Sequence, residues 1–294
     1  MIRIISLFLL LVVGAVSFSA YATDSLRHFV LDNTKIIPIK SKHTGRDHEI
    51  IIVFPASYGS DPNKTYPVFY YLDAYWDTPL LVSTYGNLIY DNEVPEFLMV
   101  GLSYPQGKNY GEERRIDYTV TPQEGVPSGG ADKFLAFIQT EVAPLIEAQY
   151  RGEKTGRILG GVSLGGLFTL TAAYRSPEFF SGYIAISPAA GWDNEVLFKI
   201  DEAYRKQNKS LNARMFISHG TKEYAPFRKP IEKFQKHLSK RKYKGLELQN
   251  YVMKDLDHVS VKGDGYVRGL IWVWKPQKPS GPAGLEREMN PKAK

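Results

Sequence analysis

The sequence predicts one α/β domain, in which a mainly parallel central sheet is flanked by helices on both faces. Three observations lead to this prediction. Short apolar or β-branched runs alternate with amphipathic segments along most of the chain. One of these runs, residues 66–72, is apolar on both faces, as expected of a central strand covered by helices. The 294 residues are 43% hydrophobic and show no internal repeat, so one large core is expected.

The expected strands and helices follow one another in order, and proline, glycine or polar clusters bound most of them. Strands are expected at residues 29–31, 35–39, 48–55, 66–72, 97–102, in the run before Ser163, and at 183–186, 213–218 and 246–253. Helices are expected at residues 80–90, 131–150, after Ser163, at 195–206 and 230–239, and in a closing segment around 270–274. The polar stretch 103–130 is expected to be an irregular loop.

The N-terminus has the pattern of a secretory signal peptide. Arg3 supplies a positive charge, residues 4–18 are nearly all apolar, and Ala20-Tyr21-Ala22 has the small-x-small form that signal peptidase cuts. We therefore expect a signal peptide at residues 1–22 and a mature domain at 23–274. This predicts a periplasmic or secreted protein with no stable membrane anchor after cleavage.

The composition of the rest of the chain excludes several classes of function. The formal net charge is +6, but basic and acidic residues are interspersed, so a nucleic-acid partner is not expected. Cysteine is absent, which excludes a thiol nucleophile, disulfides and thiolate metal sites. No paired histidines stand at ligand spacing, so neither a metal nor another cofactor is expected. The basic, proline-containing tail, residues 275–294, is expected to be disordered.

The stretch 157–168 predicts a nucleophile on a sharp turn between a strand and a helix. Its centre, residues 161–165, has the form Gly-x-Ser-x-Gly, with Ser163 in the middle. Glycines suit such a turn because a side chain beside it would meet neighbouring backbone. The following helix starts at Leu164, whose unpaired amide points at any oxyanion that forms beside Ser163.

A serine hydroxyl needs a base and an orienting acid, and in a parallel sheet both are sought on loops that follow strands. His258 lies in a polar loop after the last strand and fits the chain order serine, acid, histidine. His219 ends the preceding strand and remains an alternative base. The other histidines, His28, His43, His48 and His237, are interpreted as solvated or structural.

Glu223 is the candidate acid, since it closely follows the strand that ends near Ser218 and would lie at the same sheet edge as Ser163. A purely structural role at the start of the next helix is the alternative for this carboxylate. Asp255 and Asp257 remain competing candidates, although residues so close to His258 in sequence seldom point back at its ring.

Several stretches together resemble one known family. They are residues 66–74, the Arg-x-x-Asp-Tyr-Thr segment 114–119, residues 129–134, the serine turn, Ser187-Pro188 before Trp192, residues 220–223 and residues 258–260. On these motifs the chain resembles the Putative esterase family of α/β-hydrolases, which includes siderophore esterases, feruloyl esterases, S-formylglutathione hydrolases and mycolyltransferases. The resemblance implies an α/β-hydrolase fold with Ser163 as nucleophile, Glu223 as acid and His258 as base.

The resemblance also implies an oxyanion hole. One donor would be the amide of Leu164, and the second an amide just after Asp73, supplied by Ala74 or Tyr75. The family usually has glycine where Ala74 stands, but this change removes no backbone amide.

Side chains that follow the predicted strand ends are candidates for substrate binding. Tyr75, Trp76 and Trp192 are expected either to grip an aromatic or acyl group or to pack in the core. Arg114 is expected either to meet an anionic group of the substrate or to pair with an acid of the fold. The small residues 189–191 stand where siderophore esterases tend to carry bulkier ones, which weakens a specific siderophore assignment.

Together these patterns predict an exported serine esterase that hydrolyses a small-molecule carboxylic ester through an acyl-enzyme. An acyltransferase with a sugar or lipid acceptor shares the same acyl-enzyme and remains an alternative. A non-catalytic binding protein on the same fold is a third possibility, disfavoured because all three triad candidates are present. The oligomeric state is not predicted.

Overall fold

The computed structural model describes residues 30–290, of which those from Asn33 onward belong to one compact unit. The predicted signal peptide, residues 1–22, and its cleavage point lie outside the described residues, as does His28. The described part contains no helix long and apolar enough to cross a membrane.

Eight strands form the sheet, in the spatial order β1-β2-β4-β3-β5-β6-β7-β8. The strands are β1 (Thr34–Lys40), β2 (Asp47–Val53), β3 (Val68–Tyr71), β4 (Leu98–Ser103), β5 (Ile158–Val162), β6 (Gly182–Ile186), β7 (Ser210–Gly220) and β8 (Lys244–Met253). Only β2 pairs antiparallel with its neighbours β1 and β4, whereas the six strands from β4 to β8 are parallel. The prediction of a mainly parallel sheet is confirmed.

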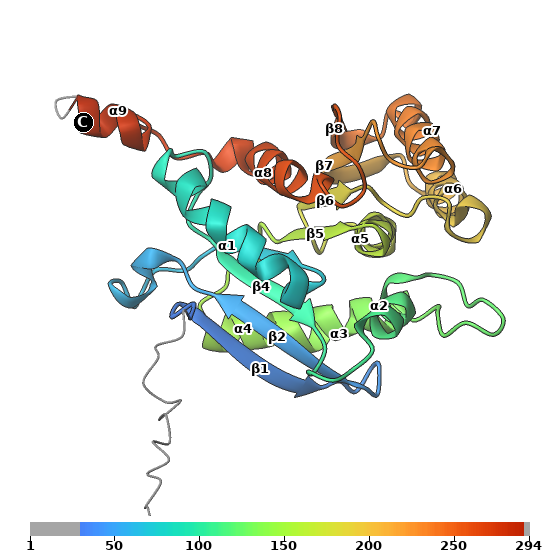
Figure 1. Cartoon of the computed structure of the whole chain (residues 1–294), viewed down its shortest axis with the longest axis horizontal. Helices are drawn as coiled ribbons and strands as arrows, with labels where there is room; N and C mark the ends of the chain where they lie inside the picture. Colours follow the sequence, from blue (N-terminus) through green and yellow to red (C-terminus); the bar gives the residue numbers. More distant parts are fainter. Residues whose placement is uncertain (1–29, 291–294) are drawn as a thin grey trace, which may run out of the picture. The chain divides into compact units, whose positions relative to one another are not determined.

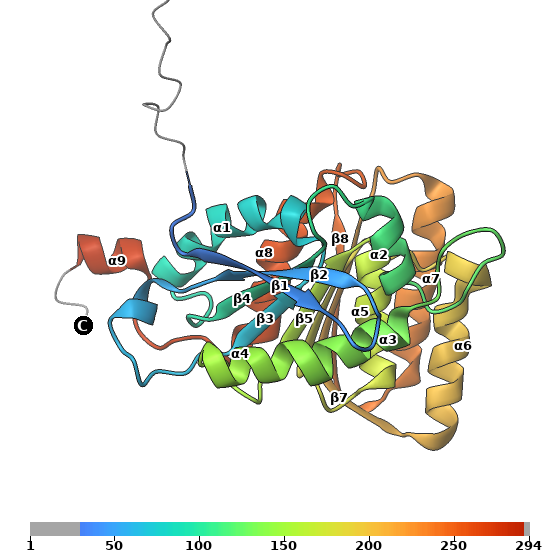
Figure 2. The same cartoon turned by 90° about the horizontal axis from the view of Figure 1, so that it is seen from below.

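Helices cover both faces of this sheet (Figures 1 and 2). One face packs against α1 (Ala74–Tyr90) and α8 (Val261–Trp274), which share an apolar core with it. The other packs against α2 (Tyr110–Tyr118), α3 (Ala131–Phe137), the π-helical segment η2 (Ile138–Val142), α4 (Ala143–Gln149), α5 (Leu164–Arg175), α6 (Trp192–Gln207) and α7 (Ala225–Arg241). A short 3-10 turn, η1 (Ala56–Gly59), follows β2.

Apolar residues at helical spacing explain why these helices dock on the sheet. In α7, Ile231, Phe234 and Leu238 are buried, whereas Lys233 and Lys236 on the opposite side are exposed. Removing such a stripe from water is the main driving force for packing a helix on a sheet.

Several predicted segments differ from the structure. The stretch 103–130 contains a helix, α2, whose N-cap Asn109 accepts a hydrogen bond from the amide of Glu112. The prediction of a loop was wrong there because α2 is mostly polar and is held by buried ion pairs instead of an apolar stripe. Val30 and Leu31, expected in an edge strand, precede β1 without forming a strand themselves.

Residues 275–290 form η3 (Lys275–Gln277) and α9 (Gly284–Met289), where composition predicts a disordered tail. Asn92 Nδ2 donates to the carbonyl of Pro282 at 2.7 Å, and Arg287 donates to the carbonyl of Tyr90 at 2.8 Å. Composition reports how little apolar surface this segment can bury, but it carries no information about hydrogen bonds to the end of α1.

The parallel strands bring several polar side chains to one edge of the sheet. Asp73 follows β3, Ser163 follows β5, Ser187 follows β6, Glu223 follows β7 and His258 follows β8. Because parallel strands end on the same side, the loops that carry these residues all lie at the carboxyl edge of the sheet.

Candidate active site

Ser163 occupies a strained turn between β5 and α5. Its backbone angles are φ 60° and ψ −116°, a conformation that few residues other than glycine adopt. A Cβ atom on Gly161 would lie 2.7 Å from the carbonyl carbon of Gly165, so glycine is required for this close approach. Leu164 is the first residue of α5, and its amide therefore has no acceptor within the helix.

Glu223 and His258 lie beside each other after β7 and β8. His258 Nδ1 is 3.6 Å from Glu223 Oε1, slightly too long for a good hydrogen bond. The side chain of Glu223 is fully buried, whereas that of His258 is 42% exposed. The ring of His258 also packs edge-on against Phe227, with 4.6 Å between ring centroids.

Backbone hydrogen bonds between two loops hold this acid and histidine together. The amide of Thr221 donates to the carbonyl of Met253 at 3.0 Å, and the amide of Lys222 donates to that of Leu256 at 2.9 Å. Gly220 makes the approach possible, because a Cβ atom there would lie 2.2 Å from the oxygen of Leu256.

The charge of Glu223 follows from its surroundings. Burial alone would raise the pKa of the carboxyl, but the interaction with His258 and a hydrogen bond from the Ser187 hydroxyl outweigh it. The pKa of Glu223 is therefore lowered from its ordinary value, and the group is ionised at neutral pH. Sequence reasoning noted Ser187-Pro188 but missed this contact.

The competing candidates have other partners. His219 is buried at the end of β7, with Nε2 3.5 Å from Glu232 of α7, and burial lowers its pKa. Asp257 Oδ1 accepts hydrogen bonds from the amides of Val259 and Ser260, and Asp255 is exposed beside Lys222.

Two further histidines are engaged in the fold. His48 is stacked on Phe137, and burial, aided by the charge of Arg46, lowers its pKa to about 3. His237 lies 2.7 Å from the buried carboxylate of Asp201.

Asp73 and Arg114 link the loop after β3 to the serine turn. Arg114 donates through Nε and Nη2 to the two carboxylate oxygens of Asp73, at 2.7 and 2.8 Å. Its Nη2 also lies 3.3 Å from the carbonyl of Val162, the residue before Ser163. Burial alone would lower the pKa of Arg114, but the ion pair raises it above its ordinary value. The sequence predicts either this pairing or a role in binding an anionic group of the substrate. In the structure the guanidinium binds Asp73 and the carbonyl of Val162.

Ala74 and Tyr75 are the first two residues of α1, so their amides lack acceptors within the helix. Asp73 precedes them in a left-handed conformation, φ 56°, and its own amide donates to the hydroxyl of Tyr118 at 3.2 Å. The first turn of α1 therefore lies at the carboxyl edge of the sheet. The amides of Ala74 and Tyr75 both remain candidates for the second oxyanion donor.

The aromatic candidates differ in exposure. Trp76 is 51% exposed and meets the ring of Tyr110 at 6.1 Å, whereas the hydroxyl of Tyr75 donates to Glu49. Trp192 is half-buried, and its indole nitrogen donates to Thr121 at 3.3 Å.

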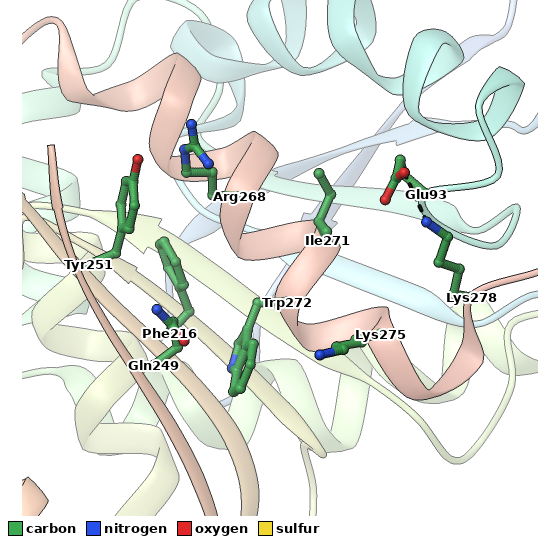
Figure 3. Close-up of a pocket in the computed structure, with 9 residues that line it drawn as sticks. All are labelled: Glu93, Phe216, Gln249, Tyr251, Arg268, Ile271, Trp272, Lys275 and Lys278. Atoms are coloured by element: carbon green, nitrogen blue, oxygen red, sulfur yellow. Dashed lines mark hydrogen bonds and ion pairs between the residues drawn. The ribbon is translucent and has the colours of Figure 1, made fainter. Parts of the chain in front are cut away.

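A separate groove lies between α8 and β8 (Figure 3). It is lined by Glu93, Phe216, Gln249, Tyr251, Arg268, Ile271, Trp272, Lys275 and Lys278. None of Ser163, Glu223 and His258 lines this groove. Two of its basic residues are already paired, Arg268 with Asp264 and Lys278 with Glu93. Across residues 30–290, no group of three or more histidine and acidic side chains is arranged to hold a metal ion.

Comparison with known proteins identifies the class of this protein. The family model described as "Putative esterase" matches residues 41–259. The chain therefore belongs to this family, and its fold is that of the α/β-hydrolase esterases.

Named relatives are esterases. Ferri-bacillibactin esterase BesA of Bacillus subtilis is 29% identical over 202 residues, which cover 63% of this chain and 69% of the relative. Siderophore triacetylfusarinine C esterase of Aspergillus fumigatus is 32% identical over 160 residues, which cover 52% of this chain and 54% of the relative. The solved BES protein of Bacillus cereus superposes with a TM-score of 0.72 at 26% identity, over 85% of this chain and 98% of that one. Together with the family, these relatives identify the chain as a carboxylic ester hydrolase.

Proposed function

We propose that the protein is an exported serine esterase that hydrolyses a small-molecule ester through Ser163, His258 and Glu223. The observation that carries the proposal is the buried carboxylate of Glu223 beside the imidazole of His258, at the sheet edge where Ser163 stands on its strained turn. A strained backbone at one group and a buried charge beside another are both costly, and such features concentrate at active sites.

In the proposed reaction, His258 takes the proton of Ser163 as the hydroxyl attacks the ester carbonyl. Glu223, ionised and buried, orients the imidazole and stabilises its protonated form. The amide of Leu164, with that of Ala74 or Tyr75, would hold the oxyanion, and one such donor typically contributes about 3 kcal/mol to the transition state. His258 then returns the proton to the leaving alcohol, and water releases the acyl group by the same steps in reverse.

The substrate we propose is an ester with an aromatic or apolar acyl group. Trp76 offers an exposed aromatic face in the first turn of α1, beside the amides of Ala74 and Tyr75 that we propose as candidates for the second oxyanion donor. The names of the relatives point to siderophore esters as members of the substrate panel.

Hydrolysis of p-nitrophenyl esters by purified residues 23–294 tests the proposal. Ser163→Ala should lower kcat by at least about 10⁴-fold without loss of the folded state, since nucleophile removal in a triad typically costs this much or more. A fluorophosphonate should label Ser163 in the wild type, as detected by mass spectrometry. Retention of turnover by Ser163→Ala would refute the assignment, and a wild type that is neither labelled nor active would favour a non-catalytic binding protein.

A further inference from the structure

The turn after β6 contacts both the nucleophile and the acid. The amide of Ala189 donates to the carbonyl of Ser163 at 2.9 Å, and the amide of Ser187 donates to the carbonyl of Ser218 at 2.8 Å. The hydroxyl of Ser187 donates to Glu223 Oε1. One short turn is therefore bonded to the nucleophile's backbone, to the neighbouring strand β7 and to the acid's side chain.

Ser187 is an unusual residue for its position. Its φ of 43° lies in the left-handed region, where glycine has no steric penalty and serine does. The residue is also fully buried. A glycine would relieve the backbone but would lack the hydroxyl that the buried carboxylate of Glu223 accepts from.

The contact selects one oxygen of the carboxylate. Ser187 Oγ and His258 Nδ1 both approach Oε1 of Glu223, the latter at 3.6 Å. The second oxygen, Oε2, is buried and has no hydrogen-bond partner within the described residues. Without the hydroxyl, the side chain of Glu223 would lose the bond that keeps Oε1 turned toward the imidazole.

We propose that Ser187 is a positioning residue, whose hydroxyl holds the ionised carboxylate of Glu223 in the orientation that His258 requires. This inference rests on the proposed triad. The titratable groups that face Glu223 are His258, on the loop after β8, and His219, at the end of β7, which itself faces Glu232 of α7.

The dependence of kcat/KM on pH in Ser187→Ala and Ser187→Gly tests the inference. Both variants should lose about 10–100-fold in kcat with little change in KM, because the hydroxyl contacts the acid and not the substrate. The acid limb of the profile should move to lower pH by at least about half a unit, because a carboxylate that is no longer held toward the imidazole stabilises the protonated ring less. The glycine variant also relieves the backbone strain at this position, whereas the alanine variant does not. Equal losses of kcat in both variants would therefore show that the missing hydroxyl, and not the backbone strain, causes the loss.

Two comparisons distinguish positioning from a merely structural role. Ser218→Ala removes another buried hydroxyl, one with no hydrogen-bond partner in the described part of the chain, and should leave kcat and the acid limb unchanged. Adding Ser187→Ala to Glu223→Gln should lower kcat by less than about twofold, since residues that act through one another are not additive.

The inference is overturned if Ser187→Ala keeps the wild-type kcat and acid limb, or if its full loss recurs in the Glu223→Gln background. The rate at which a fluorophosphonate labels Ser163 is followed over the same pH range, so the outcome does not depend on the ester chosen. If the wild type shows neither turnover nor labelling, the proposed function fails first. An active wild type with unaffected Ser187 variants refutes only the inference.

Discussion

The two halves of the proposed site are built differently. The nucleophile half, where β3 and β5 end against α2, is held by buried ion pairs and by glycines that allow backbone contact. The acid-base half, where β6, β7 and β8 end, is held by backbone hydrogen bonds between loops and by the bond from Ser187 to Glu223. The acid-base half is also more exposed, as Tyr224 and Val259, next to the acid and the histidine, are 77% and 80% exposed.

This difference separates stability from catalysis. A change in the nucleophile half disturbs charges that are buried within the fold, so it should lower stability as well as rate. A change in the acid-base half should mainly lower the rate, because hydrogen bonds between loops, and not buried ion pairs, hold it together. The following predictions, ordered from the largest expected effect to the smallest, test that separation.

Glu223→Gln should produce the largest loss of rate with a small loss of stability. The amide keeps the shape but not the charge that supports a protonated imidazole, and comparable changes lower kcat by about 10³–10⁴-fold. The free energy of unfolding should fall by no more than about 1.5–3 kcal/mol, the value of hydrogen bonds to a charged group. Urea unfolding and ester hydrolysis measure both quantities.

Asp255→Asn is the matched control for that variant, because Asp255 is an exposed acid on the adjoining loop. It should change kcat by less than about twofold, since exposed ion pairs contribute little. A larger loss of rate in Asp255→Asn than in Glu223→Gln would show that the acid has been misassigned.

Arg114→Gln should lower both stability and rate. Loss of the guanidinium leaves the buried carboxylate of Asp73 uncompensated, and breaking such a pair typically costs about 3–5 kcal/mol of folding free energy. Loss of the guanidinium that links Asp73, before α1, to the carbonyl of Val162, before Ser163, should also lower kcat about tenfold. Arg115→Gln on the same helix, whose side chain donates to the carbonyl of Pro127 at the surface, serves as the control. Equal stability of the two variants would contradict the contrast drawn between the halves.

The smallest effect expected is a pH dependence of stability that originates in the nucleophile half. His48 packs beside Asp117 of α2, and its pKa is lowered to about 3 in the folded protein, against about 6.5 when unfolded. The unfolded chain therefore binds the extra proton first, so stability is full above pH 6.5 and falls as the pH drops toward 3. The loss should be about 1–2 kcal/mol between pH 6.5 and 5, because each unit below the unfolded pKa costs at most about 1.4 kcal/mol.

Urea unfolding of wild type and His48→Gln at several pH values measures this dependence. The variant should show a flatter stability profile over that range, whereas His43→Gln, an exposed histidine on the preceding turn, should keep the wild-type slope. An unchanged slope in His48→Gln would show that another group is responsible.

Local patterns in the sequence predicted most of the sheet and the serine turn. Apolar runs such as 66–72 and 183–186 mark strands because period and burial are properties of neighbouring residues. The turn at Ser163 was predictable for the same reason, since a Cβ atom on Gly161 would meet the backbone of Gly165 within the same five-residue motif. The roles of Ser163, Glu223 and His258 stay predictions that the variants above test.

Only the tertiary structure decided the contacts between residues that are distant in the sequence. Arg114 meets Asp73 across 41 positions, and Ser187 meets Glu223 across 36. These pairs exist because β3 lies beside β4, which leads into α2, and β6 lies beside β7, an order that strand propensity does not encode. Apolar periodicity does not predict helix α2 or the short helices of residues 275–290 for a related reason, since polar partners elsewhere in the chain hold them in place. Periodicity reports which surface a segment buries, whereas the pairing of buried charges depends on which segments the fold brings together.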